Sequence, residues 1–191
     1  MIGLNSFVTL SVLLFGSVVS YPDHAECKVK YNIPLECGTV KQMILDQMQV
    51  WDKSAECPGN CEKVKQRKGA PLVRVNLEGT ETECTSCPCG QKCLYTLTNT
   101  TENTITGSHF TPVVQYEDIV SFKFSQESDT ECNVEGFSTA SLSYAYYDFG
   151  TNYCNLRNLM DGSGISEQDG YTEETSVDVC MQLDTADCTK Y

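Results

Sequence analysis

The segment TVKQMILDQMQVWDKSA, residues 39–55, spaces its apolar side chains three and four residues apart, as in a helix with one apolar face. Thr39 followed by Gln42 has the pattern of a capping box at the start of such a helix, and Pro58-Gly59 is a stop signal. A face rich in Met and Trp can be a docking surface, but at this spacing it more often belongs to the core. We therefore predict an amphipathic helix that buries Val40, Met43, Ile44, Met48, Trp51 and Ala55.

Beyond this helix the sequence changes to the two-residue period of β-strands. Apolar and polar side chains alternate in residues 72–77, 93–98 and 120–124. The longest run with strand composition is 137–149, and alternation resumes over 153–159 after a Gly-Thr-Asn turn, which predicts a hairpin. Several strands with one helix ahead of them predict an α+β fold, in which one N-terminal amphipathic helix packs on a mainly antiparallel, disulfide-rich β-sheet.

The predicted long strand has a strip of small residues on one face, formed by Ser141, Ser143 and Ala145. A strip of this kind allows a helix to pack closely against the strand. In the alternative interpretation, Ser141 and Ser143 form the floor of a cavity for an apolar ligand, with Tyr147 and Phe149 at its rim. Close helix packing explains the same pattern with fewer assumptions.

The N-terminal residues have the features of a secretory signal peptide. Residues 1–20 carry no charged side chain, and an apolar run over 7–15 is followed by the small residues Val18 and Ser20. No later run approaches the roughly 20 apolar residues that a membrane-spanning helix needs. We expect cleavage before Tyr21, a single disulfide-stabilised domain over 21–191, and a secreted, extracellular protein.

Cysteine is abundant, and all 12 cysteines follow the predicted cleavage point. An even number in an oxidising compartment predicts that they pair as disulfides, with the connectivity left open. The close spacing between Cys84 and Cys93 also suits a zinc site or a redox-active pair, but the two histidines offer no paired ligand spacing. Disulfides are therefore the preferred interpretation for Cys27, Cys37, Cys57, Cys61, Cys84, Cys87, Cys89, Cys93, Cys132, Cys154, Cys180 and Cys188.

Charge is distributed unevenly along the chain, which carries 13 Lys and Arg against 26 Asp and Glu, a formal net charge of −13. Residues 117–191 hold 15 acidic and 3 basic side chains, whereas residues 21–116 hold 11 and 10. This balance disfavours binding to nucleic acid, whose phosphates are attracted by clustered Lys and Arg. The acidic half instead favours cations, a mineral phase or basic extracellular proteins as partners, unless the charge only keeps the protein soluble.

A glycine- and serine-rich run after residue 160 offers oxygen ligands of the kind that calcium prefers. The run does not match an EF-hand, because Ser166 and Thr172 stand where that loop requires Gly and Glu. We expect at most weak calcium binding and no other cofactor. The candidate ligands are Asp161, Ser163, Glu167 and Asp169.

One acceptable glycosylation sequon, Asn99-Thr100-Thr101, lies in a stretch rich in Thr and Asn that is typical of an exposed loop. We predict a glycan on Asn99.

The sequence contains no zinc-protease, nucleophile-elbow, phosphate-loop or dinucleotide-binding motif. We therefore expect a non-catalytic secreted protein of an extracellular matrix or fluid, whose acidic surface contacts cations, mineral or basic partners. The first alternative is a secreted carrier that holds a small apolar molecule between helix and sheet. The second is a secreted hydrolase, which would need carboxylates or His109 to converge in a cleft.

Overall fold

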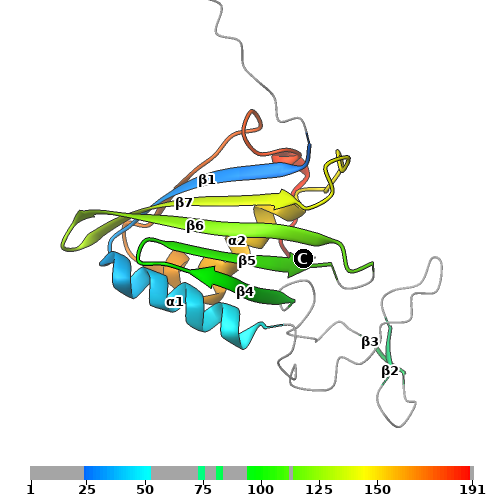
Figure 1. Cartoon of the computed structure of the whole chain (residues 1–191), viewed down its shortest axis with the longest axis horizontal. Coiled ribbons are helices and arrows are strands. Elements are labelled where there is room, and N and C mark those ends of the chain that lie inside the picture. Colours follow the sequence, from blue (N-terminus) through cyan, green and yellow to red (C-terminus); the bar gives the residue numbers. More distant parts are fainter. Residues whose placement is uncertain (1–23, 53–72, 76–80, 84–93, 112–113, 190–191) are drawn as a thin grey trace, which may run out of the picture.

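Six antiparallel strands form the main sheet, in the order β4-β5-β6-β7-β1-β8 (Figure 1). The structure is a computed structural model that describes residues 24–52, 73–75, 81–83, 94–111 and 114–189. A separate two-stranded sheet pairs β2 with β3. The strands are β1 Glu26–Ile33, β2 Val73–Val75, β3 Glu81–Glu83, β4 Tyr95–Thr100, β5 Thr104–Phe110, β6 Glu117–Ser128, β7 Glu131–Ala140 and β8 Thr172–Glu174.

Two α-helices, α1 (Cys37–Val50) and α2 (Thr151–Gly162), pack against the same face of the main sheet and contact each other. Alternate side chains of the long strands are buried on this face and exposed on the other, as expected for a sheet covered on one side. The core lies between the sheet and the helices. Its strand and helix residues include Val29, Tyr31, Ile33, Ile44, Met48, Ile105, Phe122, Val134, Leu156 and Leu159.

Helix α1 buries the apolar face that its sequence predicts, with Val40, Ile44 and Met48 inside. The helix begins two residues before Thr39, because the side chain of Glu36 caps it by accepting a hydrogen bond from the Thr39 backbone N–H at 3.3 Å. It ends at Val50. Ala55 and the Pro58-Gly59 stop signal lie outside the described residues.

The α+β class and the antiparallel sheet are confirmed, but the prediction of one N-terminal helix ahead of all the strands is wrong. Strand β1 precedes α1, and a second helix, α2, occupies the residues where sequence alternation predicts a strand over 153–159. The buried side of α2 contains Asn152 and Asn155 as well as Leu156 and Leu159. Because two of these four positions are polar, apolar periodicity does not reveal the helix.

The long strand predicted over 137–149 is correct only over residues 137–140, because β7 ends at Ala140. Its partner β6 begins at Glu117, and Asp118 pairs with Ala140 at the end of the ladder. Beyond this point no strand of the described chain is aligned to pair with residues 141–149, so they form the loop that leads into α2.

Three disulfides join described residues: Cys27–Cys180, Cys37–Cys132 and Cys154–Cys188. They connect β1 to the C-terminal segment, the first turn of α1 to β7, and α2 to the last described residues. Six of the twelve cysteines are thus shown to be paired. The other six lie outside the described residues: Cys57, Cys61, Cys84, Cys87, Cys89 and Cys93. The predicted signal peptide of residues 1–20 also lies outside them.

Gly107 of β5 lets α1 approach the sheet, and its replacement tests this packing. A Cβ atom at Gly107 would lie 2.5 Å from Met48 Cε and 2.7 Å from the backbone oxygen of Thr96. We expect Gly107→Ala to lower the free energy of unfolding by about 1–3 kcal/mol, because a backbone atom cannot move aside as a side chain can. Urea unfolding measures the change.

The matched control is Gly38→Ala in α1, where the nearest atoms are those of the exposed, flexible Glu36 side chain. This variant should change the free energy of unfolding by less than about 1 kcal/mol, because the preference of Ala over Gly in a helix offsets the displacement of the capping Glu36 side chain. Equal stability of the two variants would contradict the close approach of Met48 and of the Thr96 backbone to Gly107.

Candidate functional site

Five aromatic side chains gather at one end of the sheet with 54% to 77% of their surface exposed. Four belong to the loop that joins β7 to α2, and Tyr116 belongs to the turn that precedes β6. The Ser141 N–H donates to the carbonyl of Glu117 at 2.9 Å, which places the loop and the turn side by side, and Figure 1 shows both at the same end of the sheet. We call this surface the aromatic end: Tyr116, Tyr144, Tyr146, Tyr147 and Phe149.

The loop that carries four of these rings is fixed to the rest of the fold by backbone hydrogen bonds. The Ala25 N–H donates to the carbonyl of Ala145 at 2.7 Å, which ties the middle of the loop to the chain just before β1. The backbone N–H groups of Asp148 and Phe149 both donate to Gln182 Oε1, at 2.7 and 2.8 Å. A single glutamine therefore holds the end of the loop.

Phe149 is held in the left-handed region, with φ of 55°, and Gln182 has φ of 54°. Such conformations are unfavourable for residues other than glycine and persist only where the surroundings impose them. The next residue, Gly150, has φ of 80°, and a Cβ atom there would lie 2.5 Å from Ala186 Cα. Close contact with the C-terminal segment thus fixes the backbone that presents the Phe149 ring.

Asp148 connects the aromatic end to the start of α2. One carboxylate oxygen accepts from the Gly150 N–H at 3.1 Å, and the other accepts from the backbone and side-chain N–H groups of Asn152 at 3.0 and 2.8 Å. A carboxylate at this position satisfies N–H groups that a helix start leaves without partners and interacts favourably with the helix dipole.

A buried polar network continues from Asn152 underneath α2. Ser138 Oγ donates to Asn152 Oδ1 at 2.6 Å, and Asn155 Nδ2 donates to both Ser138 Oγ and Asp118 Oδ2, at 3.2 and 2.9 Å. Asn152, Ser138, Asn155 and Asp118 are all buried. The network therefore runs from the loop of the aromatic end to a carboxyl group inside the fold.

Burial is the main reason why the pKa of Asp118 is raised to about 6. The hydrogen bond from Asn155 lowers this pKa in part, and the negative charges of Asp148 and Glu117 contribute to raising it. The carboxyl group therefore gains or loses its charge near pH 6, far above the usual range for aspartate.

Tyr147 and Phe149, which the sequence places at the rim of a ligand cavity, are part of the aromatic end. The strand predicted to carry Ser141 and Ser143 does not extend this far, and all four side chains are exposed in the loop. Sequence reasoning missed Tyr116, Tyr144, Tyr146 and Gln182 as parts of this surface. The run SYAYYDF was a usable signal for the rings of the loop, because so many aromatics in succession exceed what one strand face can bury.

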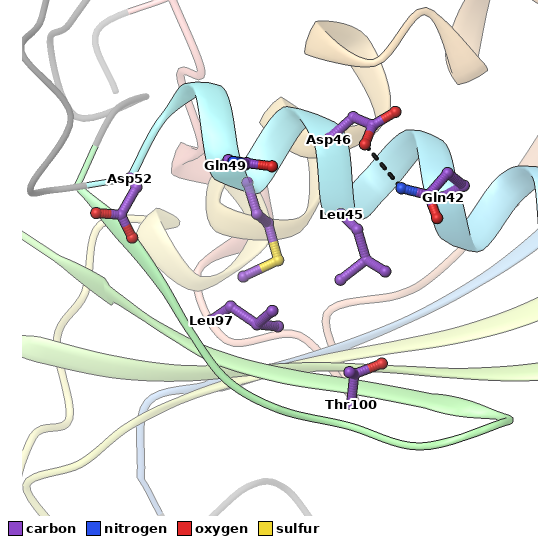
Figure 2. A pocket seen from close by; sticks show the side chains of 8 residues that line it. Gln42, Leu45, Asp46, Gln49, Asp52, Leu97 and Thr100 are labelled. Atoms are coloured by element: carbon purple, nitrogen blue, oxygen red, sulfur yellow. Dashed lines mark hydrogen bonds between the residues drawn. The ribbon is translucent and has the colours of Figure 1, made fainter.

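A groove of about 590 Å³ lies between α1 and the edge strand β4 (Figure 2). Leu45 and Met48 of α1 and Leu97 of β4 form its apolar part, and Figure 2 shows Leu45 and Leu97 facing each other across it. Its volume is in the range of small-molecule sites. The remaining lining residues are polar: Gln42, Asp46, Gln49, Asp52 and Thr100.

A second polar cluster joins β8 to α2 around the carboxylate of Glu173. Glu173 accepts from the hydroxyl groups of Tyr153 and Tyr171 at 2.7 and 3.0 Å and pairs with Arg157 at 3.0 Å. Burial and the neighbouring Glu173 raise the pKa of Tyr153 to about 12. These groups satisfy one another, which is the arrangement of a structural contact between a short strand and a helix.

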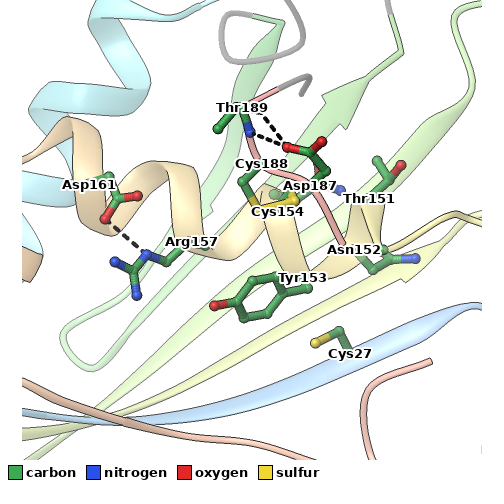
Figure 3. Close-up of a disulfide and its surroundings, with 12 residues drawn as sticks. Cys27, Thr151, Asn152, Tyr153, Cys154, Arg157, Asp161, Asp187, Cys188 and Thr189 are labelled. Atoms are coloured by element: carbon green, nitrogen blue, oxygen red, sulfur yellow. Dashed lines mark hydrogen bonds and ion pairs between the residues drawn. A yellow bond between two sulfur atoms is a disulfide. The ribbon is translucent and has the colours of Figure 1, made fainter. Parts of the chain in front are cut away.

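The four candidate calcium ligands are spread over the end of α2 and the turn that follows. Asp161 Oδ1 accepts from Arg157 Nε at 2.9 Å (Figure 3) and from Ser166 Oγ at 2.7 Å. Ser163 Oγ donates to the Leu159 carbonyl at 2.6 Å. Within the described ranges, no three His, Cys, Asp or Glu side chains are grouped so that they could hold a metal ion. Weak calcium binding by Asp161, Ser163, Glu167 and Asp169 therefore stays a prediction.

The prediction of an exposed loop around Asn99 is wrong, because Asn99 lies on β4, an edge strand, but the residue is exposed as expected. It stands next to a register shift between Leu97 and Asn99. A glycan there would project from a sheet edge, a position at which proteins block unwanted strand pairing. Glycosylation stays a prediction.

No helix among the described residues is both long and apolar enough to cross a membrane.

Comparison with known proteins shows no matching family model and no matching curated protein. Weak structural similarity exists to a Thermobifida fusca protein solved by NMR, with 13% identity over 73% of this chain and 93% of that chain, at a TM-score of 0.34. The phosphoglucomutase pp63/parafusin from Paramecium is 9% identical over 77% of this chain and 22% of that chain, at a TM-score of 0.30. The di-domain ARO/CYC protein BexL from the BE-7585A biosynthetic pathway is 13% identical over 80% of this chain and 53% of that chain, at a TM-score of 0.31.

Proposed function

We propose that this protein is a secreted, non-catalytic component of an extracellular matrix or fluid, whose acidic surface contacts basic proteins, cations or a mineral phase. The observation that carries the proposal is the excess of acidic over basic side chains in residues 117–191, 15 against 3, on a fold cross-linked by disulfides. Many of these carboxylates are exposed: Glu127, Asp129, Glu135, Asp161, Glu167, Asp169, Glu174, Asp178 and Asp184.

The disulfides support the secreted part of this proposal, because they form and persist mainly outside the cytosol. The charge-free, apolar residues 1–20 support it independently. Expression of the full chain in a secretory cell line should yield protein in the medium whose N-terminus is Tyr21 and whose Asn99 carries a glycan. Retention in the cell with an intact N-terminus would contradict secretion.

The acidic-surface proposal is tested by removing four exposed charges after α2. In the neutral variant Glu167→Gln, Asp169→Asn, Glu174→Gln and Asp178→Asn are combined. We expect binding to immobilised poly-lysine and to hydroxyapatite to weaken about tenfold at low salt, because attraction between oppositely charged surfaces scales with their charge. Surface plasmon resonance and adsorption isotherms measure the two interactions.

The matched control keeps the charge and changes only side-chain length: Glu167→Asp, Asp169→Glu, Glu174→Asp and Asp178→Glu. This variant should bind like the parent protein. If the neutral variant also binds like the parent, the acidic surface is not the contact and the proposal fails.

The groove between α1 and β4 favours a second candidate function, the carriage of a small apolar molecule. Its volume of about 590 Å³ and the apolar residues Leu45, Met48 and Leu97 are the supporting observations. Native mass spectrometry of the protein from its own secretion should then show a bound organic mass, and substitution of Leu97 by Asp should remove it. Consistently empty protein would count against a carrier. The hydrolase alternative stays untested.

A further inference from the structure

The aromatic end combines exposed rings with negative charge and lacks basic side chains in its sequence. Residues 114–118 and 141–150, which carry its five rings, contain Glu117 and Asp148 as well as the buried Asp118, but no Lys or Arg. The supporting segment 181–189 adds Asp184 and Asp187 and also contains no Lys or Arg. A surface of this kind is complementary to a positively charged partner.

The rings are presented on a backbone that is already ordered. Gln182 accepts hydrogen bonds from the N–H groups of Asp148 and Phe149, and Gly150 packs against Ala186. A partner that binds such a loop does not have to order it, so less of the contact energy is lost. Large exposed apolar patches on a protein surface often mark sites at which a partner binds.

The composition of the loop, SLSYAYYDFG, fits recognition of another protein. Tyrosine supplies a large contact area with few rotatable bonds, and serine and glycine supply adaptable polar contacts, which is the combination that antibody binding loops use. A membrane surface fits less well, since the net charge of −13 repels anionic lipid headgroups.

We propose that the aromatic end is a docking surface for an arginine-rich segment of an extracellular protein. The inference rests on the proposed function and specifies its partner and its contact surface. Guanidinium groups stack on the exposed faces of Tyr144, Tyr146 and Tyr147, because a cation is attracted to the negative face of an aromatic ring and guanidinium is planar and weakly hydrated. Nearby carboxylates attract the segment from a distance, and the rings select arginine over lysine.

The test uses the full chain and two fluorescent nonapeptides, one of alternating Arg and Gly and one of alternating Lys and Gly. We expect the arginine peptide to bind a few-fold more tightly than the lysine peptide, and Tyr144→Ala/Tyr147→Ala to weaken its binding about tenfold. The control Val177→Ala/Val179→Ala also removes two exposed apolar side chains, outside the aromatic end, and should bind like the parent. Fluorescence anisotropy measures affinity, and thermal unfolding checks that all variants fold.

Three results would overturn the inference. If the tyrosine variant binds the arginine peptide like the parent while the neutral carboxylate variant does not, the acidic-surface proposal stands and the docking surface is wrong. If the parent binds neither peptide and neither poly-lysine nor hydroxyapatite, both proposals fail. If the parent binds phosphatidylcholine vesicles through Tyr144 and Tyr147 and does not bind the arginine peptide, the partner is a membrane.

Discussion

Removal of the Cys154–Cys188 disulfide is expected to lower the free energy of unfolding by about 2–4 kcal/mol. The bond joins buried Cys154 of α2 to the C-terminal segment and closes a loop with a sequence separation of 34 residues (Figure 3). Cross-linking over such a distance restricts the unfolded chain, and its loss lets the unfolded state gain entropy. Urea unfolding of Cys154→Ala/Cys188→Ala measures the effect.

The same variant should weaken arginine-peptide binding, since the segment that Cys188 anchors also carries Gln182, which holds Asp148 and Phe149. Thr189→Ala is the control. It removes an exposed hydroxyl group that donates to Asp187, two residues away, at 2.5 Å, and should change the free energy of unfolding by less than about 0.5 kcal/mol. A disulfide variant as stable as this control would show that the C-terminal segment does not brace α2.

Stability should also depend on pH through Asp118. Its pKa in the folded protein is about 6, above the ordinary value of 3.8, so folding favours the protonated form. The stabilising contribution of protonated Asp118 to the free energy of unfolding is therefore fully present below about pH 4, and it is lost as the pH rises through 6. A shift of this size means that ionised Asp118 lowers the free energy of unfolding by about 3 kcal/mol at neutral pH, compared with its value at low pH.

Asp118→Asn removes the charge but keeps an oxygen that can accept the hydrogen bond from Asn155. We expect this variant to be more stable than the parent by about 2 kcal/mol at pH 8 and to show no advantage at pH 4. Chemical unfolding across this range measures the difference, with Asp184→Asn as an exposed control. An advantage of equal size at both pH values would contradict a buried carboxyl group that titrates near pH 6.

The parts of the fold that follow from local periodicity are predictable from sequence. The buried face of α1 follows from the spacing of Val40, Ile44 and Met48, and the centre of β6, residues 120–124, follows from the alternation around Phe122. Helix α2 is different, because Asn152 and Asn155 lie on its buried side and bond to Ser138 and Asp118. Their burial depends on partners distant in sequence, which local patterns do not contain.

The aromatic end shows the same limit for a functional surface. Tyr144, Tyr146 and Tyr147 have high strand propensity, but they lie beyond the point where β6 begins, and no strand of the described chain is aligned to pair with them. Tyr116 reaches the same surface only because β6 and β7 are antiparallel. Gln182 reaches Phe149 across 33 residues of sequence, a contact that depends on how the C-terminal segment returns to α2.

Chemical-shift mapping on the isotope-labelled full chain tests the central claim most directly. The alternating Arg–Gly nonapeptide is titrated while amide and aromatic ring signals are recorded. The docking surface predicts the largest changes in residues 144–149 and in the ring of Tyr116, with small changes around Glu167 to Asp178. Changes spread evenly over the acidic residues, with the tyrosine rings unaffected, would contradict it.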